Sequence, residues 1–328
     1  MFDLISVGDS VVDTFIPLTD AKILNDGGEV VLALRYGDKI PVGPSTSLVA
    51  GNACNNAVGS SRLKLKTAIY THVGNQSDDQ DDFRIINKLK RERVDTRFIT
   101  EDPGLPSNHH IVLDFKGERT ILIYHQPWQY KLPDLEFSKW VYFTSLGPTF
   151  AQSNLIAELI NYLERTNAKM LYNPGTFQIK LGVKKNARLL SLTEVFIVNK
   201  EEAKLILGFK DSEKMEVKKL LAGLLDLGPR RVIVTDGGEG SYGYEGGSFF
   251  HLGVFPAKLV EMTGSGDAYA TGVLAGLFHG EGIKDAMRWG AANGAAVVEH
   301  IGPQVGLLTY DVMLEKLKEN YKIVVREI

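Results

Sequence analysis

Short apolar segments alternate with amphipathic helical segments through most of the chain from Thr67 onward. We expect strands at residues 67–73, 140–144, 169–172, 194–198 and 231–235. Helices are expected between some of them: residues 78–93 have an apolar stripe with charged side chains opposite, and residues 154–165 also read as a helix. Strands that alternate with helices predict a mostly parallel central sheet with helices on both faces.

Two antiparallel stretches interrupt this alternation. Residues 30–36 and 39–42 read as short strands around a Gly37-Asp38 turn, and residues 111–115 and 120–124 read as a hairpin. A chain of 328 residues exceeds the usual size of a single core, so a large domain with an appendage, or two domains, is expected. We favour a single domain over residues 1–328, with a small β-sheet lid formed by about 19–49 and 108–125. Exposed lid edges commonly pair with a second copy, so we expect a homodimer through the lid.

Composition excludes several classes of protein. The net charge of −3 gives no general attraction to nucleic acid or to an anionic membrane, so any phosphate site must be local. A single cysteine, Cys54, excludes an intramolecular disulfide and a cysteine-based zinc cluster. The start of the chain lacks the features of a signal peptide, and its apolar runs are too short to span a bilayer. A cytoplasmic location is expected.

The segment Thr263-Gly264-Ser265-Gly266-Asp267 precedes a helix of small apolar residues. Glycines allow successive backbone N–H groups to face one point, and a helix N-terminus adds partial positive charge there, which suits a phosphate. An aspartate beside such a cradle would repel the anion, but it is useful as a base that accepts a proton from an attacking hydroxyl. The alternative is a glycine-rich turn with Asp267 as a helix N-cap.

Asn199-Lys200-Glu201-Glu202 follows a buried strand and starts a helix. The spacing of Asn199 and Glu202 is that of a capping box. A functional interpretation places Glu202 at the edge of the sheet, where it orients waters on a Mg²⁺ ion bound to a triphosphate. Both interpretations are open at this point.

Two further segments suggest a nucleotide site. Thr235, Gly237 and Gly240 follow another buried strand, and their glycines let a nucleotide approach the main chain, although a simple hairpin turn has the same composition. The alanine-rich helix that contains Asn293 either packs closely in the core or lines a flat adenine slot.

Residues near the N-terminus suit a polyhydroxylated ligand. A short buried strand is predicted at residues 4–8, and Asp13 lies on the loop after it, at the sheet edge where ligands bind, or else stabilises a turn. Gly51 precedes a helix that contains Asn52 and Asn55. These amides offer donors and acceptors to hydroxyl groups, whereas N-capping by Asn52 is the structural alternative.

Four of these segments, in this order, resemble the ribokinase family of sugar and nucleoside kinases, also called the phosphofructokinase-B (PfkB) family. They are residues 50–55 (family pattern Gly-Gly-x-x-x-Asn), 199–202 (Asn-x-x-Glu), 235–240 (Thr-x-Gly-x-x-Gly) and 263–267 (Thr-Gly-Ala-Gly-Asp). The resemblance covers nearly the whole chain and implies a ribokinase-like three-layer α/β sandwich with a β lid over the acceptor.

The resemblance also assigns roles to individual residues. It implies Asp267 as catalytic base, an anion hole from Gly264, Ser265 and Gly266, and a Mg-phosphate site that includes Asn199 and Glu202, with Glu202 reaching the metal through water. On the nucleotide side it places Thr235, Gly237, Gly240, Thr263 and Asn293, and on the acceptor side Asp13, Gly51, Asn52 and Asn55.

The chain departs from the family pattern at several positions. Glu261-Met262 replaces the frequent Asp-Thr, in a region that helps build a monovalent-cation (K⁺) site in many members, which places potassium activation in question. Ser265 replaces a usual alanine, and Ala50 replaces the first glycine of the N-terminal pair. Asn173-Pro174-Gly175 lacks the acidic residue common after the third strand.

The resemblance therefore implies an ATP- and Mg²⁺-dependent phosphotransferase acting on a hydroxyl, expected to be a primary CH₂OH. A sugar or sugar derivative is the first choice of acceptor and an adenosine-type nucleoside the second. A nucleoside requires a slot for its base, for which Phe15, Tyr36, Tyr124 and Trp128 are candidates, although they equally suit the core of the lid. A non-catalytic sugar- or nucleotide-binding regulator on the same fold is the third alternative.

Overall fold

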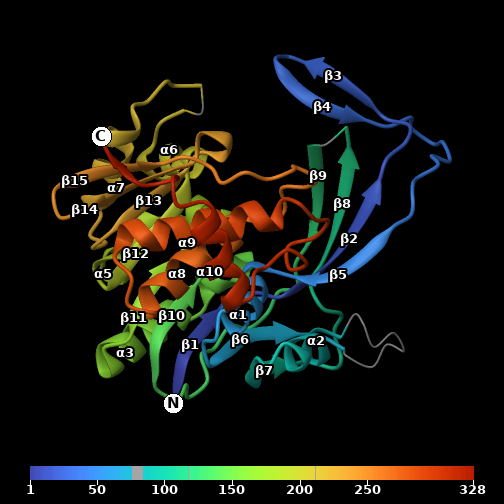
Figure 1. Ribbon diagram of the computed structural model, residues 1–328. Helices are drawn as coiled ribbons and strands as arrows, with labels where there is room; N and C mark the ends of the chain where they lie inside the picture. Colours follow the sequence, from blue (N-terminus) through green and yellow to red (C-terminus); the bar gives the residue numbers. More distant parts are fainter. Residues whose placement is uncertain (76–83, 117, 211) are drawn as a thin grey trace.

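The computed structural model describes residues 1–75, 84–116, 118–210 and 212–328, and its centre is a ten-stranded sheet (Figure 1). The strand order is β16-β15-β14-β13-β12-β11-β10-β1-β6-β7, parallel from β13 to β7 and antiparallel from β13 to β16. The strands are β1 (Phe2–Val7), β6 (Thr67–Val73), β7 (Asp95–Glu101), β10 (Ser138–Phe143), β11 (Lys169–Tyr172), β12 (Thr193–Asn199), β13 (Val232–Thr235), β14 (Ser241–Glu245), β15 (Ser248–Leu252) and β16 (Arg326–Glu327). The mostly parallel sheet predicted from the sequence is confirmed.

Helices cover both faces of this sheet because the strands carry apolar side chains on both faces. In β10, Val141 and Phe143 pack into one core, whereas Trp140 and Tyr142 pack into another on the opposite face. The first face carries α3 (Leu155–Thr166), α4 (Thr176–Leu181), α5 (Ala187–Ser191), α6 (Lys200–Leu207) and α7 (Val217–Leu225). The second face carries α1 (Asn52–Arg62), α2 (Ile85–Arg91), α8 (Ser265–Phe278), α9 (Ile283–Val297) and α10 (Tyr310–Glu319). The three-layer sandwich expected from the resemblance is therefore present.

A separate four-stranded sheet projects from one end of this body as a lid (Figure 1). Its order is β5-β2-β8-β9, formed by β2 (Val11–Pro17), β5 (Thr46–Ala50), β8 (His109–Phe115) and β9 (Glu118–Tyr124). A hairpin of β3 (Lys22–Asp26) and β4 (Glu29–Ala33) lies beyond it. The small separate sheet predicted from the sequence is confirmed.

The lid differs from the sequence prediction in detail. The first hairpin turns at Gly27-Gly28 rather than at Gly37-Asp38, and residues 39–42 form only an isolated bridge, from Val42 to Leu18. Asp13 lies within β2 rather than on a loop. All of β3 and the start of β4 are exposed, so this hairpin lacks the buried apolar runs that identify the central strands. Of the helix predicted at 78–93, α2 begins at Ile85, and residues 76–83 lie outside the described part.

Within the described residues, no helix is both long enough and apolar enough to cross a membrane.

Candidate active site

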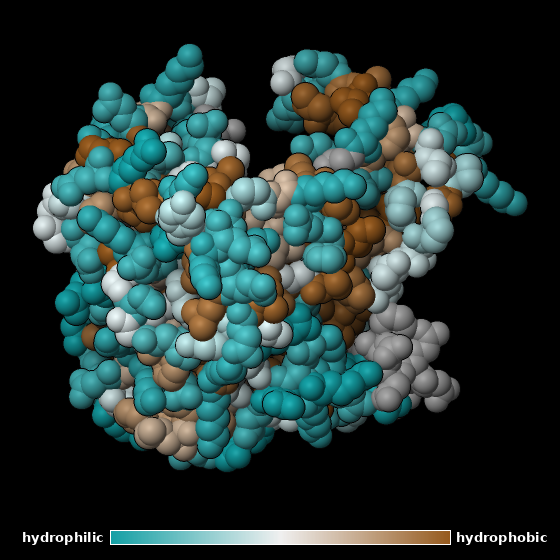
Figure 2. Space-filling model, viewed as in Figure 1, coloured by the Kyte–Doolittle hydropathy of each residue, from teal (hydrophilic) through white to brown (hydrophobic). Residues whose placement is uncertain are grey.

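A cavity of about 560 Å³ lies between the lid and the carboxyl ends of the parallel strands. The loops that follow β1, β10, β11 and β12 line it, together with the N-terminal ends of α1 and α8 and the inner face of the lid. We call it the polar cavity, because carboxylates, amides and hydroxyls form much of its wall. Figure 2 shows the molecule hollowed between the lid and the main body. Ligands of open parallel sheets bind at this edge.

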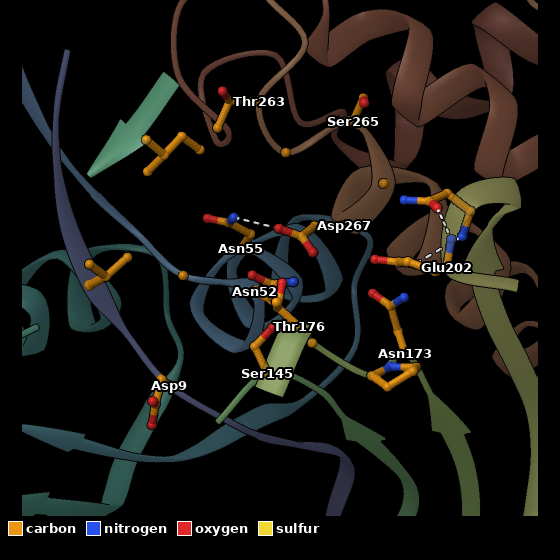
Figure 3. A pocket seen from close by; sticks show the side chains of 18 of the residues that line it. Asp9, Asn52, Asn55, Ser145, Asn173, Thr176, Glu202, Thr263, Ser265 and Asp267 are labelled. Carbon is orange, nitrogen blue, oxygen red and sulfur yellow. Dashed lines mark hydrogen bonds between the residues drawn. The ribbon is translucent and has the colours of Figure 1, made fainter. Parts of the chain in front are cut away.

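Asp267 is the third residue of α8 and lies buried in the wall of the polar cavity. The N-cap of α8 is Gly264, and no side chain caps the helix, so Asp267 is not the N-cap that its position allowed. Its Oδ2 accepts a hydrogen bond from Asn55 Nδ2 at 2.8 Å (Figure 3). Burial raises the pKa of Asp267 from 3.8 to about 6, the Asn55 hydrogen bond opposes that rise, and the charge of Asp13 adds to it.

The start of α8 offers backbone donors beside this carboxylate. Ser265 N–H bonds to the Met262 carbonyl at 3.2 Å. Among the described residues, no hydrogen bond uses the N–H groups of Gly264, Gly266 or Asp267. Unpaired N–H groups in the first turn of a helix, together with the helix dipole, favour an anion. Of the three N–H groups predicted to form an anion cradle, those of Gly264 and Gly266 are unpaired within the described part of the chain, as is that of Asp267, whereas that of Ser265 is paired.

Asn199 and Glu202 form the capping box that the sequence allowed. Asn199 Oδ1 accepts the Glu202 backbone N–H at 2.8 Å, and Glu202 Oε2 accepts the Asn199 backbone N–H at 2.9 Å. Both residues also line the polar cavity, and Glu202 reaches toward the same space as Asp267 (Figure 3). Burial raises the pKa of Glu202 to about 7, the Asn199 hydrogen bond opposes the rise, and the charges of Glu201 and Asp267 add to it.

The residues predicted for the acceptor also line the polar cavity, namely Asp13, Gly51, Asn52 and Asn55. Gly51 has φ 101°, and a Cβ there would lie 2.6 Å from the Asp9 carbonyl oxygen, so glycine is required for α1 to start here. The structural alternative for Asn52, N-capping, does not occur, because Gly51 is the N-cap of α1 and no side chain caps the helix.

An adjoining cavity of about 470 Å³ is mostly apolar, and we call it the apolar cavity. It shares Thr235 and Gly237 with the polar cavity, and Gly240 lines it as well. The remaining wall is dominated by small and apolar side chains, among them Val254, Phe255, Pro256, Leu259, Ala291, Ala295 and Val298. A flat ring system fits such a slot.

Asn293 lies apart from the other predicted site residues. It is fully buried and lines neither cavity. Its Nδ2 donates to the Ala268 carbonyl at 2.8 Å, and its Oδ1 accepts the Leu308 backbone N–H at 3.0 Å. Asn293 thus ties α9 to α8 and to the loop before α10, while Ala291 and Ala295 of α9 face the apolar cavity.

Several polar residues of the cavity were not predicted from the sequence. Asp9 accepts hydrogen bonds from Tyr130 Oη at 2.8 Å and from the Gly147 backbone N–H at 2.8 Å. His110 Nδ1 lies 3.2 Å from Asp13 Oδ1, and the rings of His110 and His125 are 5.2 Å apart. For Asp9, its position just after β1 was a sequence signal for a site at the end of a parallel strand. The histidines had no such signal, because pairing between lid strands brings them into the cavity.

The fold and the site together define a ribokinase-like small-molecule kinase. The fold is a three-layer α/β body with a β lid, and the N-terminus of α8 lies where the polar cavity meets the apolar cavity. The family model described as "pfkB family carbohydrate kinase" matches residues 14–309. The chain therefore belongs to the PfkB family of ATP-dependent carbohydrate kinases.

Individual relatives are distant in sequence but similar over nearly the whole chain. The chain is 24% identical over 324 residues to the ATP-dependent 6-phosphofructokinase of Thermoanaerobacterium thermosaccharolyticum, covering 95% of this chain and 92% of the relative. Its fold matches that of Arabidopsis thaliana ribokinase complexed with ribose and ATP, with TM-score 0.78, 17% identity, and 97% and 99% of the two chains covered. The nucleoside kinase of Methanocaldococcus jannaschii gives TM-score 0.77 at 19% identity, with 97% and 99% covered.

Proposed function

We propose that this protein transfers the γ-phosphate of ATP to a hydroxyl of a sugar or sugar derivative, with Asp267 as the general base. The observation that carries the proposal is the position of Asp267: a buried carboxylate with a raised pKa, held by Asn55, beside the unpaired N–H groups of Gly264 and Gly266. A protein that only bound the anion would have no use for a carboxylate at this point.

The acceptor hydroxyl lies between Asp267 and the γ-phosphate in this mechanism. Asp267 accepts its proton as the oxygen attacks in line, and ADP leaves. The N–H groups of Gly264, Gly266 and Asp267 stabilise negative charge on the transferring group. The lid excludes water from the polar cavity, which limits ATP hydrolysis. A primary CH₂OH group is the least hindered hydroxyl for this position.

Glu202 and Asn199 are suited to a Mg²⁺-triphosphate. No group of three or more His, Cys, Asp or Glu that could ligate a metal occurs among the described residues. Magnesium does not need such a group, because it keeps several waters and takes other ligands from phosphates. Glu202, acting through water, would hold the ion, which supplies neutralising charge to the phosphate oxygens when bound. Glu261 Oε1 accepts the Thr263 N–H at 2.6 Å and lies 3.7 Å from Arg119 Nη1, and a potassium ion is not part of this proposal.

A sugar acceptor suits the polar cavity better than a nucleoside does. None of the four aromatic residues considered for a base slot lines that cavity: Phe15 and Trp128 are buried in the core, and Tyr36 and Tyr124 are exposed. Asp9, Asp13, Asn52 and Asn55 instead offer acceptors and donors to several hydroxyl groups. The 6-phosphofructokinase among the relatives supports a sugar derivative, while the likeness to a nucleoside kinase keeps adenosine-type nucleosides as the second candidate.

The decisive experiment measures ADP release from ATP and Mg²⁺ across pentoses, hexoses, sugar acids, sugar phosphates and nucleosides. We expect acceptor-dependent turnover with a sugar or sugar derivative. ATP binding without turnover of any acceptor would contradict the proposal and favour a non-catalytic regulator.

The activity should fall at acidic pH because two carboxylates with raised pKa values must be ionised. Asp267, with a pKa of about 6, has to accept a proton, and Glu202, with a pKa of about 7, has to be anionic to orient metal-bound water. We expect kcat/KM for the acceptor to rise from about pH 5 to about pH 8. In a Glu202→Gln variant, kcat/KM should rise only with the ionisation of Asp267, near pH 6. A profile that stays flat down to about pH 5 would argue against Asp267 as the base.

We propose that the lid also forms a homodimer. β9 is the edge strand of the lid sheet, and its Leu122 and Tyr124 are each 50% exposed, so a second copy would cover apolar surface there. Light scattering should give twice the 36.2 kDa chain mass, and Leu122→Lys should give the monomer. Leu314→Lys, an exposed position on α10, is the matched control and should remain dimeric. A monomeric wild-type protein would contradict this proposal.

A further inference from the structure

Arg119 brings a permanent positive charge to the wall of the polar cavity. It lies on the lid strand β9, whose alternate residues Arg119, Ile121 and Ile123 line the cavity, as expected for one face of a strand. Among the described residues that line this cavity, Arg119 is the only lysine or arginine. The other charged side chains of its wall are carboxylates, and the two histidines stand beside Asp9 and Asp13.

The guanidinium of Arg119 is only weakly engaged by the protein. Its partner is Glu261, whose Oε1 lies 3.7 Å from Nη1, beyond hydrogen-bond distance. That same oxygen accepts the Thr263 backbone N–H at 2.6 Å. No hydrogen bond from Arg119 to another described residue occurs, and its side chain is 36% exposed. Because a guanidinium stays charged and carries five N–H donors in a planar fork, Arg119 has donors for a carboxylate or phosphate.

The lid strands hold this positive charge away from the part of the cavity around Asp13, which we call the acidic end. Asp13 on β2 lies opposite His110 on β8, which lies opposite Ile123 on β9. Arg119 is four residues further along β9, about 13 Å away at the usual rise of a strand. The acidic end suits hydroxyl groups and repels an anion, whereas the Arg119 end attracts one. A six-carbon acceptor with an anionic group at one end fits this distribution of charge. The long side chain of Arg119 spans part of the distance between the two ends, and the acceptor spans the rest.

We infer that Arg119 determines acceptor specificity by binding a carboxylate or phosphate on the acceptor, so that the substrate is a sugar acid or a sugar phosphate rather than a neutral sugar. This inference rests on the proposed kinase function and narrows its substrate class. The γ-phosphate of ATP is the other anion that comes near the Thr263 loop, and the test separates the two sources.

The test compares matched acceptors in the wild type, Arg119→Met and Arg119→Lys. D-fructose 6-phosphate is paired with D-fructose, and D-gluconate with D-glucose. We expect Arg119→Met to lower kcat/KM about 10- to 100-fold for the preferred anionic acceptor, mainly through KM, because one charge-assisted interaction is lost. Turnover of the neutral partner and the KM for ATP should not change. Arg119→Lys should lie between, since it keeps the charge but not the fork.

Glu261→Gln is the matched control, because it removes the ion pair and leaves an oxygen to accept the Thr263 N–H. It should keep the preference for the anionic acceptor. The inference is overturned if Arg119→Met and Glu261→Gln have the same effect, because Arg119 would then act only as the ion-pair partner of Glu261. It is also overturned if Arg119→Met raises the KM for ATP with every acceptor, which would assign it to the γ-phosphate.

Binding keeps this test separate from that of the kinase function. Calorimetry measures D-fructose 6-phosphate and D-gluconate binding to the wild type and to Arg119→Met in the presence of ADP. Loss of turnover with all acceptors would count against the proposed function, whereas Arg119-dependent binding would still support the inference. Equal binding to the two proteins, or binding to neither, would overturn it.

Discussion

Replacement of Asp267 by asparagine is expected to lower phosphoryl transfer by at least about 10²- to 10⁴-fold, the usual contribution of a positioned base. The amide has nearly the same shape and can still accept the hydrogen bond that Asn55 donates at 2.8 Å in the wild type, but it cannot take the proton of the acceptor. ATP binding should persist, because the backbone N–H groups at the start of α8 do not change. Single-turnover kinetics and ATP calorimetry measure the two effects separately.

The pH dependence of stability shows whether Asp267→Asn loses activity through loss of the base or through unfolding. The folded protein raises the pKa of Asp267 from 3.8 to about 6, so the wild type loses stability progressively as the pH rises through that interval and the buried carboxyl group ionises. The asparagine side chain of the variant bears no charge, so above about pH 7 the variant should be the more stable protein, by up to about 3 kcal/mol for two pKa units. The difference should vanish below about pH 4. Equal stability at all pH values, or an active variant, would contradict the assignment.

Asp311→Asn is the matched control for the substitution itself. Asp311 pairs with Lys64 at the surface, with its side chain 81% exposed. An exposed ion pair contributes little to stability. This variant should therefore keep the activity and the pH dependence of the wild type.

The sequence predicted the central body well because buried parallel strands have a strong signature. The runs at 67–73 and 169–172 coincide with β6 and β11, and every residue of β6 is buried. The four motif segments also meet at one edge of the sheet: two end or follow the parallel strands β12 and β13, and the other two open α1 and α8. The carboxyl ends of parallel strands place residues together that lie far apart in the chain.

The lid and its contributions to the cavity were less predictable. β3 and the start of β4 are exposed, so neither face has an apolar period, and the hairpin was placed one strand too late. Arg119, His110 and His125 reach the cavity only through pairing of lid strands, which no local pattern specifies. The residues around Asn293 show the opposite case, in which a helix lines the apolar cavity with alanines while its asparagine is turned into the core.

Gly264→Ala should cost at least about 10²-fold in kcat, which is the effect of losing one preorganised donor. Gly264 has φ 79°, a conformation that costs other residues about 1–2 kcal/mol. A Cβ there would also lie 2.3 Å from Pro303 Cβ and 2.7 Å from Pro303 Cα, and a proline ring cannot rotate away. The loop must move, and the N–H groups of Gly264 and Gly266 move with it, away from the γ-phosphate.

Gly280→Ala separates displacement of the cradle from backbone strain. Gly280 follows the other end of α8 and has φ 94°, yet no atom lies within 4 Å of the position that a Cβ would take, so only the strain is introduced. Both variants should lose stability in thermal unfolding, Gly264→Ala by more, but Gly280→Ala should retain full kcat. If Gly264→Ala also retained its kcat after correction for the folded fraction, the start of α8 would not be the site that stabilises the transferring phosphate. Because the N–H groups and Asp267 belong to the same first turn, the two substitutions at this end of α8 test one site: Asp267→Asn removes the base and keeps the cradle, and Gly264→Ala displaces the cradle and keeps the carboxylate.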